Sequence, residues 1–277
     1  TVITGISHDH REHLGRTKRK ILAEKLGVAR AGAPLVANLA PRALVEQAAA
    51  HCAAIGVPFH PVGDEVAISL EEISASRMVV RARTPRRDYG ELSTRMIGRA
   101  QARNVATALR AVEMLEEAGI LRNAGAGTIR RGIASAFLAG RFQAVSESPR
   151  IVLDVAHNEE SLLAALDTVR RVSPRDRTTI VFAVLAHKEL GLFPGRAVKA
   201  AREVIVAPLG DSRSASGDKL GRVFGAARRA AGGNAAAVSV ARGIGQAIRE
   251  ARRRAGPSDT IVIMGSHVTV EEAVPFL

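Results

Sequence analysis

The stretch "RIVLDVAHN", residues 150–158, opens a regular pattern that decides the fold of the second half of the chain. Branched apolar residues run up to Asp154, and a polar segment follows them. Near-continuous apolar strands that alternate with helices are typical of a parallel sheet covered on both faces. The sequence therefore predicts a Rossmann-like α/β domain over residues 150–277. The later apolar runs of this pattern are "TTIVFAVL" (178–185), "EVIVAPL" (203–209), "AVSVA" (237–241) and "DTIVIMG" (259–265).

Polar side chains follow most of these strands at the point where each strand ends. Because ligands of open α/β sheets bind outside the carboxyl ends of the strands, these clusters predict a binding site at one edge of the sheet. The structural alternative is that they only cap helices and form turns. The clusters are Asp154, His157 and Asn158 after the first strand, His187 and Lys188 after the second, Asp211, Ser212 and Arg213 after the third, and Ser266 and His267 after the last.

The first half of the chain mixes helices with short strands. Apolar periodicity predicts helices at 17–29, 41–55, 99–118 and near 127–138. Strands are expected in "TVITGIS", "PLVANL", "PFHPV", "VAISL" and "MVVRART", and "AGRFQAVSESPR" is interpreted as the joint between domains. We therefore predict two α/β domains. Their boundaries are a first domain at 1–138, a linker at 139–149 and a second domain at 150–277.

The composition fits a globular protein and limits its partners. The 277 residues are 47% hydrophobic and 24% charged, and the formal net charge is +13. Much of the positive excess lies in arginine-rich segments such as 226–230 and 249–256, which we interpret as solvated helix faces. Nucleic-acid binding is a weaker alternative, because only 3% of the residues are aromatic and no known binding module is recognisable.

Cysteine usage and the lack of long apolar runs indicate the compartment. The single cysteine, Cys52, excludes an intrachain disulfide and fits a reducing compartment, so we expect a cytoplasmic protein. No apolar run approaches the roughly 18 residues of a membrane span, and no signal peptide is recognisable, so we expect no membrane partner. The chain starts at Thr1 inside an expected strand, and we interpret it as a processed chain or a piece of something longer.

With these pieces located, the chain resembles the folylpolyglutamate synthase/dihydrofolate synthase family of the Mur ligase superfamily. The resemblance implies the second part of a Mur-ligase-type central ATPase domain, followed by a C-terminal glutamate-ligase domain. It also implies ATP-dependent addition of L-glutamate to a folate or dihydropteroate carboxylate through an acyl phosphate, with ATP and Mg²⁺ as cofactors. The matching stretches are "ITGISHDHREHLGRTKRKILAEKLGVARAGAPLV" (3–36), "MIGRAQARNVATALRAVE" (96–113), "GRFQAVSESPRIVLDVAHN" (140–158), "APLGDSRSAS" (207–216) and "GSHVTVEEAV" (265–274).

Two residues of the first matching stretch take roles that the resemblance implies. His10 matches a histidine that coordinates Mg²⁺, and Lys25 matches a lysine that becomes carbamylated and joins the cation site. Lys25 stands between Leu22 and Leu26, so we expect partial burial that would leave a neutral amine able to take up CO₂. The alternatives are an exposed helical lysine and, for the histidine-rich segment 8–13, a zinc site or a plain loop.

The resemblance also places residues of both domains around a nucleotide. Asn104 matches an asparagine that approaches the nucleotide, and Arg141 matches a linker arginine that reaches an ATP phosphate. A guanidinium suits that task because its fork of donors binds phosphate in a bidentate way. Asp154 and His157 match an aspartate and a histidine that the C-terminal domain brings to the nucleotide. Ala100 departs from the family, which has a histidine there.

The family's phosphate-binding loop has no counterpart in these 277 residues, since no G-x-x-x-x-G-K-[ST] pattern occurs. We therefore expect the chain by itself to be inactive, and a monomer once complete. The alternative is a non-catalytic relative that binds a nucleotide or a folate, or a subunit that needs a separate P-loop polypeptide. Saturable binding of a folate would separate both readings from a nucleic-acid binder, whose affinity would depend strongly on salt.

Overall fold

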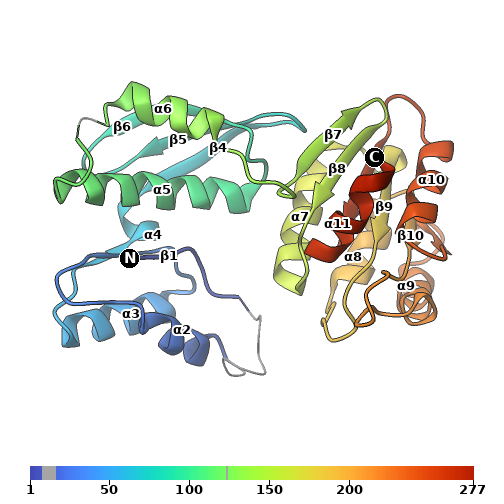
Figure 1. The fold of residues 1–277 in the computed structure, drawn as a ribbon, viewed down its shortest axis with the longest axis horizontal. Helices are drawn as coiled ribbons and strands as arrows, with labels where there is room; N and C mark the ends of the chain where they lie inside the picture. Colours follow the sequence, from blue (N-terminus) through green and yellow to red (C-terminus); the bar gives the residue numbers. More distant parts are fainter. Residues whose placement is uncertain (8–16, 123) are drawn as a thin grey trace. The chain divides into compact units, whose positions relative to one another are not determined.

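The computed structural model describes residues 1–7, 17–122 and 124–277. The chain forms two compact units, and each has its own sheets and core (Figure 1). The first unit consists of Thr1–Glu72, Arg77–Arg95 and Arg99–Ala136. The second consists of Ile73–Ser76, Met96–Gly98 and Phe137–Leu277. No helix among the described residues has both the length and the apolar character needed to cross a membrane.

The first sheet of unit 1 is a short parallel sheet of order β1-β2-β3. Two helices pack on it through a core of Ile, Leu, Val and Ala side chains that also contains Cys52. Helix α2 begins after Thr17, whose side chain accepts a hydrogen bond from the Lys20 N–H and so caps the helix. The elements are β1 (Val2–Ile3), α2 (Lys18–Leu26), β2 (Leu35–Ala37), α3 (Arg42–Ala54) and β3 (Phe59–Pro61).

The second sheet of unit 1 has the order β4-β5-β6, and β5 and β6 are antiparallel. Strand β5 buries its first three residues, Met78–Val80, and Ala82, whereas Arg81 and Arg83 are exposed, so one face of the sheet covers the core. The elements are α4 (Val62–Glu65), β4 (Ala67–Ile73), β5 (Met78–Arg83), β6 (Asp88–Thr94), α5 (Arg99–Glu117) and α6 (Ala126–Ser135).

Helix α5 carries a buried network of charged and hydroxyl groups. Glu113 is fully buried, and its Oε1 accepts hydrogen bonds from Thr84 Oγ1 at 2.5 Å and from the Tyr89 hydroxyl at 3.0 Å. Its other oxygen pairs with Arg110 at 3.2 Å, and Arg110 also pairs with Glu65. Burial, reinforced by the charge of Glu113, raises the pKa of Tyr89 to about 12, so its hydroxyl stays protonated and remains a donor.

Unit 2 contains a six-stranded sheet of order β11-β10-β9-β12-β8-β7. All neighbours are parallel except β7, which is antiparallel to β8. The predicted parallel sheet is therefore confirmed. Its elements are β7 (Gln143–Glu147), β8 (Arg150–Asp154), α7 (Glu159–Val172), β9 (Thr178–Phe182), α8 (Phe193–Ala200), β10 (Glu203–Val206), α9 (Gly217–Ala231), β11 (Ala237–Val240), α10 (Ile244–Arg254), β12 (Thr260–Met264) and α11 (His267–Ala273).

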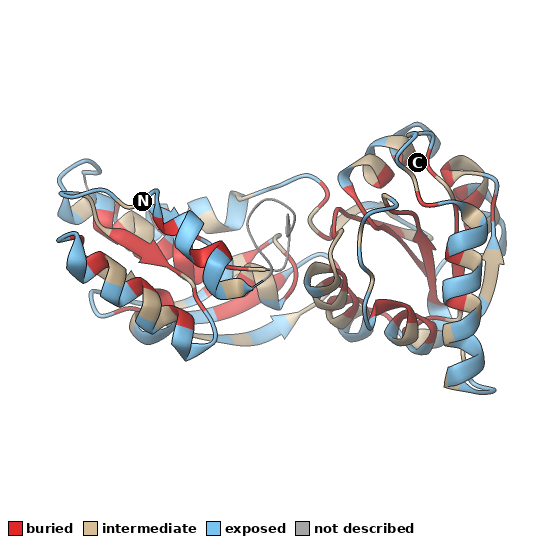
Figure 2. Ribbon diagram, turned by 90° about the horizontal axis from the view of Figure 1, so that it is seen from below, coloured by how far each residue is buried: buried red, intermediate tan, exposed pale blue. Residues whose placement is uncertain are grey.

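The sheet of unit 2 is covered on both faces, which is why its four central strands β8, β9, β10 and β12 are buried almost throughout (Figure 2). Helices α7, α8 and α9 follow one another along one face, where Phe182, Phe193 and Phe224 pack with ring centroids 5.0 to 6.1 Å apart. Helices α10 and α11 pack together over a second core that includes Ile151, Leu153 and Ile263. The last strand of the chain, β12, lies between β8 and β9.

Two strands differ from the expectation drawn from the sequence. Residues 143–147, predicted as part of a linker, form the edge strand β7, and the stretch 139–149 lies entirely in unit 2. Strand β7 is short, half exposed and interrupted by an irregularity between Ala144 and Ser146, so it lacks a clear alternating pattern. Strand β6 has no predicted counterpart for a similar reason, since it contains Asp88, Gly90 and Glu91.

Candidate active site at the carboxyl edge of the six-stranded sheet

Asp154 ends strand β8 and is 8% exposed, which is unusual for a carboxylate. Its two oxygens accept backbone hydrogen bonds from opposite sides. Oδ1 accepts from the Ala156 N–H at 2.8 Å, and Oδ2 accepts from the Phe142 N–H at 3.0 Å. One buried carboxylate therefore fixes two loops, the turn before β7 and the loop that leads into α7.

The turn before β7 presents Arg141 between two residues of left-handed backbone. Gly140 has φ +68°, and a side chain there would bring its Cβ within 2.6 Å of Val155 Cγ1. Phe142 has φ +48°, a conformation that a bulky residue rarely adopts. The side chain of Phe142 is buried and its N–H is held by Asp154, so the surroundings impose the strain. Arg141, half-buried, is thus held in a defined position.

Electrostatic coupling ties these residues into one cluster. Burial raises the pKa of Asp154 to about 6, although the two backbone hydrogen bonds and the charges of Arg141 and His157 oppose the shift. Burial, together with the charges of Arg141 and His157, lowers the pKa of His267. The structure thus brings Arg141, Asp154 and His157 together and adds His267, while their roles stay predictions.

His157 lies in the loop between β8 and α7. Its Nδ1 is 3.0 Å from the Val155 carbonyl oxygen, which can only accept, so Nδ1 carries a proton in this contact. Directly after it, Asn158 and Ser161 form a capping box that satisfies the first N–H groups of α7. The ring of His157 is 6.0 Å from the ring of His267, centroid to centroid.

His267 is the first residue of α11 and follows β12, the neighbour of β8 in the sheet. Ser266 caps this helix by accepting from the Thr269 N–H at 3.0 Å. Helices α7 and α11 leave adjacent strands toward opposite faces of the sheet, which is the arrangement that opens a ligand crevice in α/β folds. The sequence marks His267 as a strand-end residue, but only the strand order shows that it adjoins His157.

The predicted site residues of unit 1 that the structure describes are exposed, unlike the cluster around Asp154. Lys25 lies in the last turn of α2 and is exposed, so the partial burial expected from Leu22 and Leu26 is wrong, because those two side chains enter the core and the lysine does not. Asn104 is exposed on α5, where its Nδ2 donates to Gln101 Oε1 at 2.9 Å. His10 lies outside the described residues.

The described part of the chain assembles no group of three His, Cys, Asp or Glu side chains that would hold a metal ion. The described residues therefore do not form a magnesium site by themselves. The magnesium roles of His10 and Lys25, and the alternative zinc site around His10, stay predictions.

The remaining strand-end clusters are less suited to a site. Asp211 and Arg213 pair with each other at 2.7 Å, and this hydrogen-bonded contact lowers the pKa of Asp211 to about 2. That cluster therefore completes its own turn. His187 is exposed in the turn after β9, and Lys188 is half-buried beside it, so both stay predicted lining residues.

Residues 140–267 match the family model described as Mur ligase, glutamate ligase domain. The chain is 33% identical over 192 residues to a dihydrofolate synthase/folylpolyglutamate synthase of Bacillus subtilis, covering 68% of this chain and 44% of that protein. It is 28% identical to the Escherichia coli protein of the same name, covering 97% of this chain and 58% of that one. The chain thus spans about half the length of these curated relatives.

Solved structures show the same fold. The chain is similar to Escherichia coli FolC in complex with DHPP and ADP, with a TM-score of 0.81, 26% identity, and coverage of 99% of this chain and 60% of that one. It also shares the fold of Mycobacterium tuberculosis folylpolyglutamate synthase complexed with ADP, with a TM-score of 0.83, 24% identity, and coverage of 99% and 62%. Residues 140–267 therefore belong to the glutamate ligase domain family of Mur ligases, and the chain as a whole resembles the folylpolyglutamate synthase/dihydrofolate synthase family.

Proposed function

We propose that the chain contributes to an ATP-dependent ligase that adds L-glutamate to a folate or dihydropteroate carboxylate. The observation that carries the proposal is the cluster of Arg141, Asp154 and His157, in which a buried carboxylate holds the turn that presents an arginine. Relatives named dihydrofolate synthase/folylpolyglutamate synthase, and a related structure with DHPP and ADP, support the substrate class.

The chemistry proceeds in two transfers. The γ-phosphoryl group of ATP moves to a carboxylate oxygen of the pteroyl substrate, which gives an acyl phosphate and ADP. The amino group of glutamate then attacks the acyl carbon, a C–N bond forms, the C–O bond to phosphate breaks, and the amine releases a proton. Arg141 donates to oxygens of the transferring phosphoryl group, where negative charge accumulates.

Asp154 acts through the backbone in this proposal, because its oxygens already hold the Phe142 and Ala156 N–H groups. It is therefore a positioning residue for Arg141. His157, whose Nδ1 is fixed by the Val155 carbonyl oxygen, is proposed to contact the nucleotide at the edge of the crevice. In unit 1, Asn104 is proposed to contact the nucleotide.

The test uses the complete gene product that contains these 277 residues and measures incorporation of labelled glutamate into a folate acceptor. Arg141→Ala should lower kcat by roughly a hundredfold or more, because one transition-state contact is worth on the order of 3 kcal/mol. Arg141→Lys should recover only part of the rate, since an ammonium cannot bind two oxygens as a fork. Arg171→Ala serves as the control, since this arginine is exposed on α7 and pairs with Asp167.

Binding of ADP is measured in parallel so that folding, binding and turnover are separated. Normal glutamate transfer by a folded Arg141→Ala protein would contradict the assignment of this site. Saturable ADP or folate binding with no glutamate transfer by the wild type would favour the non-catalytic alternative. Ala100, where the family has histidine, gives a specific reason to include that measurement.

A further inference from the structure

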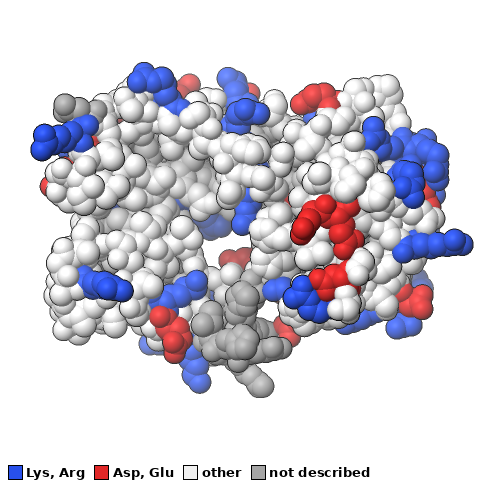
Figure 3. All heavy atoms as spheres, in the orientation of Figure 1, with Lys and Arg blue, Asp and Glu red and all other residues white. Residues whose placement is uncertain are grey.

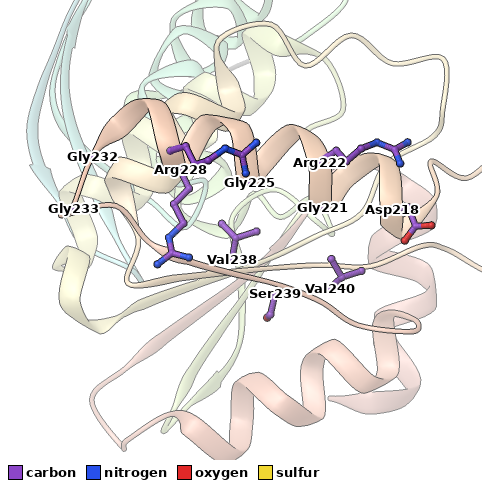
Figure 4. A pocket seen from close by; sticks show the side chains of 11 residues that line it. Asp218, Gly221, Arg222, Gly225, Arg228, Gly232, Gly233, Val238, Ser239 and Val240 are labelled. Atoms are coloured by element: carbon purple, nitrogen blue, oxygen red, sulfur yellow. The ribbon is translucent and has the colours of Figure 1, made fainter.

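An open groove of about 800 Å³ runs between helix α9 and strand β11, at the opposite end of the sheet order from β7 and β8 (Figure 4). We call it the α9–β11 groove. Its volume falls within the range of ordinary ligand sites, about 300 to 1,000 Å³. Its helix side carries three arginines, one carboxylate at the start of α9 and several glycines, and its strand side is formed by residues 238–240. The helix-side residues are Asp218, Gly221, Arg222, Gly225, Arg228 and Arg229, followed by Gly232 and Gly233.

Glycines hollow out the groove. Gly217, Gly221 and Gly225 recur every four residues and lie along one face of α9. A Cβ on Gly221 would lie 2.7 Å from Val240 Cγ2, so helix and strand approach closely there. At Gly225 a Cβ would meet only the Arg229 guanidinium at 3.6 Å, and near Gly232 it would meet nothing within 4 Å. The groove therefore widens toward the end of the helix.

The strand side offers unpaired backbone groups. Among the described residues β11 ends the sheet and pairs with β10 alone. Ala237 and Ala241 donate their N–H groups to Arg202 and Val206, so odd-numbered residues face β10. Because strand geometry has a period of two, the N–H and C=O groups of the intervening Val238 and Val240 face outward. Such an edge is a template for another strand.

The positive charge of the groove disfavours a second copy of this chain as its binding partner. Arg222, Arg228 and Arg229 are all exposed, and within the described ranges no carboxylate lies in ion-pair distance of any of them. Two copies joined edge to edge would bring these arginines together, on a chain of net charge +13. An acidic strand would instead place carboxylates of alternate residues against the guanidinium groups.

We propose that the α9–β11 groove binds an extended acidic peptide segment, which adds to the sheet as a further strand beside β11. Main-chain hydrogen bonds form to Val238 and Val240, whose side chains point toward α9 in Figure 4, while that of Ser239 points away. Carboxylates at every second position of the peptide face the arginines of α9. This interaction is separate from the ligase site, because β10, β9 and β12 lie between β11 and β8.

The test titrates the 277-residue chain with a short blocked peptide in which glutamate alternates with threonine, and follows binding by calorimetry. Saturable binding that weakens with salt is expected, and a lysine–threonine peptide should not bind. Val240→Pro removes an outward N–H and leaves the β10 ladder intact, so it should weaken binding at least about tenfold. Gly225→Leu places a side chain in the groove and should weaken peptide binding by a similar factor. Ala226→Leu, at the exposed neighbouring position, should bind the peptide like the wild type.

Charge variants complete the test. Arg222→Glu with Arg229→Glu should abolish binding, whereas the matched pair Arg170→Glu with Arg253→Glu, on exposed arginines of α7 and α10, should retain it. Thermal unfolding checks that each variant is folded. The proposal is overturned if Val240→Pro and Gly225→Leu bind the peptide like the wild type. Loss of binding in the arginine variants alone would then identify the groove as a general anion surface.

Discussion

The burial of Asp154 makes the stability of the folded chain depend on pH. Its pKa is about 6 in the folded chain and 3.8 in the reference state, so the folded protein binds a proton more tightly than the unfolded chain. A group with a raised carboxyl pKa makes the folded state lose stability as the pH rises through that window. The loss between about pH 4 and about pH 6 is about 3 kcal/mol at most, taking about 1.36 kcal/mol per pKa unit.

Asp154→Asn should remove this dependence. The amide cannot accept both backbone hydrogen bonds, so the variant should be less stable than the wild type at about pH 4, by about 1 to 3 kcal/mol. Because only the wild type loses stability as the pH rises, the difference in unfolding free energy between the two proteins should shift in favour of the variant by up to about 3 kcal/mol at about pH 7. Urea unfolding at several pH values across this range measures it, and a difference that stays constant would show that Asp154 is not the titrating group.

At the scale of elements, helix α5 depends on its buried ion pairs more than on any surface pair. Arg110→Ala leaves the fully buried Glu113 without its cation and should destabilise the first unit by about 3 to 5 kcal/mol. Arg81→Ala is the matched control, because the Arg81–Glu91 pair has the good distance of 2.8 Å but both side chains are more than half exposed. It should cost less than about 1 kcal/mol.

Thermal or urea unfolding of the two variants provides the comparison. Equal losses for Arg110→Ala and Arg81→Ala would mean that the buried network contributes no more than a surface pair. The double variant Arg110→Met with Glu113→Gln fills the space with apolar atoms and removes both charges. It should destabilise the unit less than Arg110→Ala, since replacing both charges together can be far less costly than removing one.

Secondary structure is predictable from the sequence where burial leaves a pattern. The parallel strands of the second unit are buried on both faces, so their apolar runs are legible in the sequence. Strand β7 is not, because an exposed edge strand needs no such run. Asp154 is identifiable from its place at a strand end, but its link to Phe142 is not, since left-handed backbone at a phenylalanine is imposed by tertiary contacts. The expectation for Lys25 fails because flanking leucines do not by themselves bury a lysine.

At the scale of the whole molecule, the second unit has the contents of an independent domain. It has a complete six-stranded sheet with helices on both faces, and nearly all of it comes from Phe137–Leu277. A fragment of residues 137–277 should therefore fold alone and unfold cooperatively. Circular dichroism during thermal unfolding measures this, and a fragment without a cooperative transition would show that the short segments from the first half are required.

The charge distribution on one face of the molecule gives no support to the nucleic-acid alternative. On the face drawn in Figure 3, lysine and arginine side chains are scattered, and acidic side chains gather between them on the second unit. A continuous basic stripe, which tracks a nucleic-acid backbone, is not visible on that face.

The position of β12 has a consequence for synthesis on the ribosome. This strand occupies the middle of the sheet, between β8 and β9, yet it is the last of the six to be translated. Until it emerges, the nascent domain holds two partial sheets whose facing edges have no partner. Such unpaired edges are targets for chaperones and proteases, and they are paired only when β12 is added to the sheet. A premature stop shortly before Thr260 should therefore yield a product that is degraded rather than a slightly shortened domain.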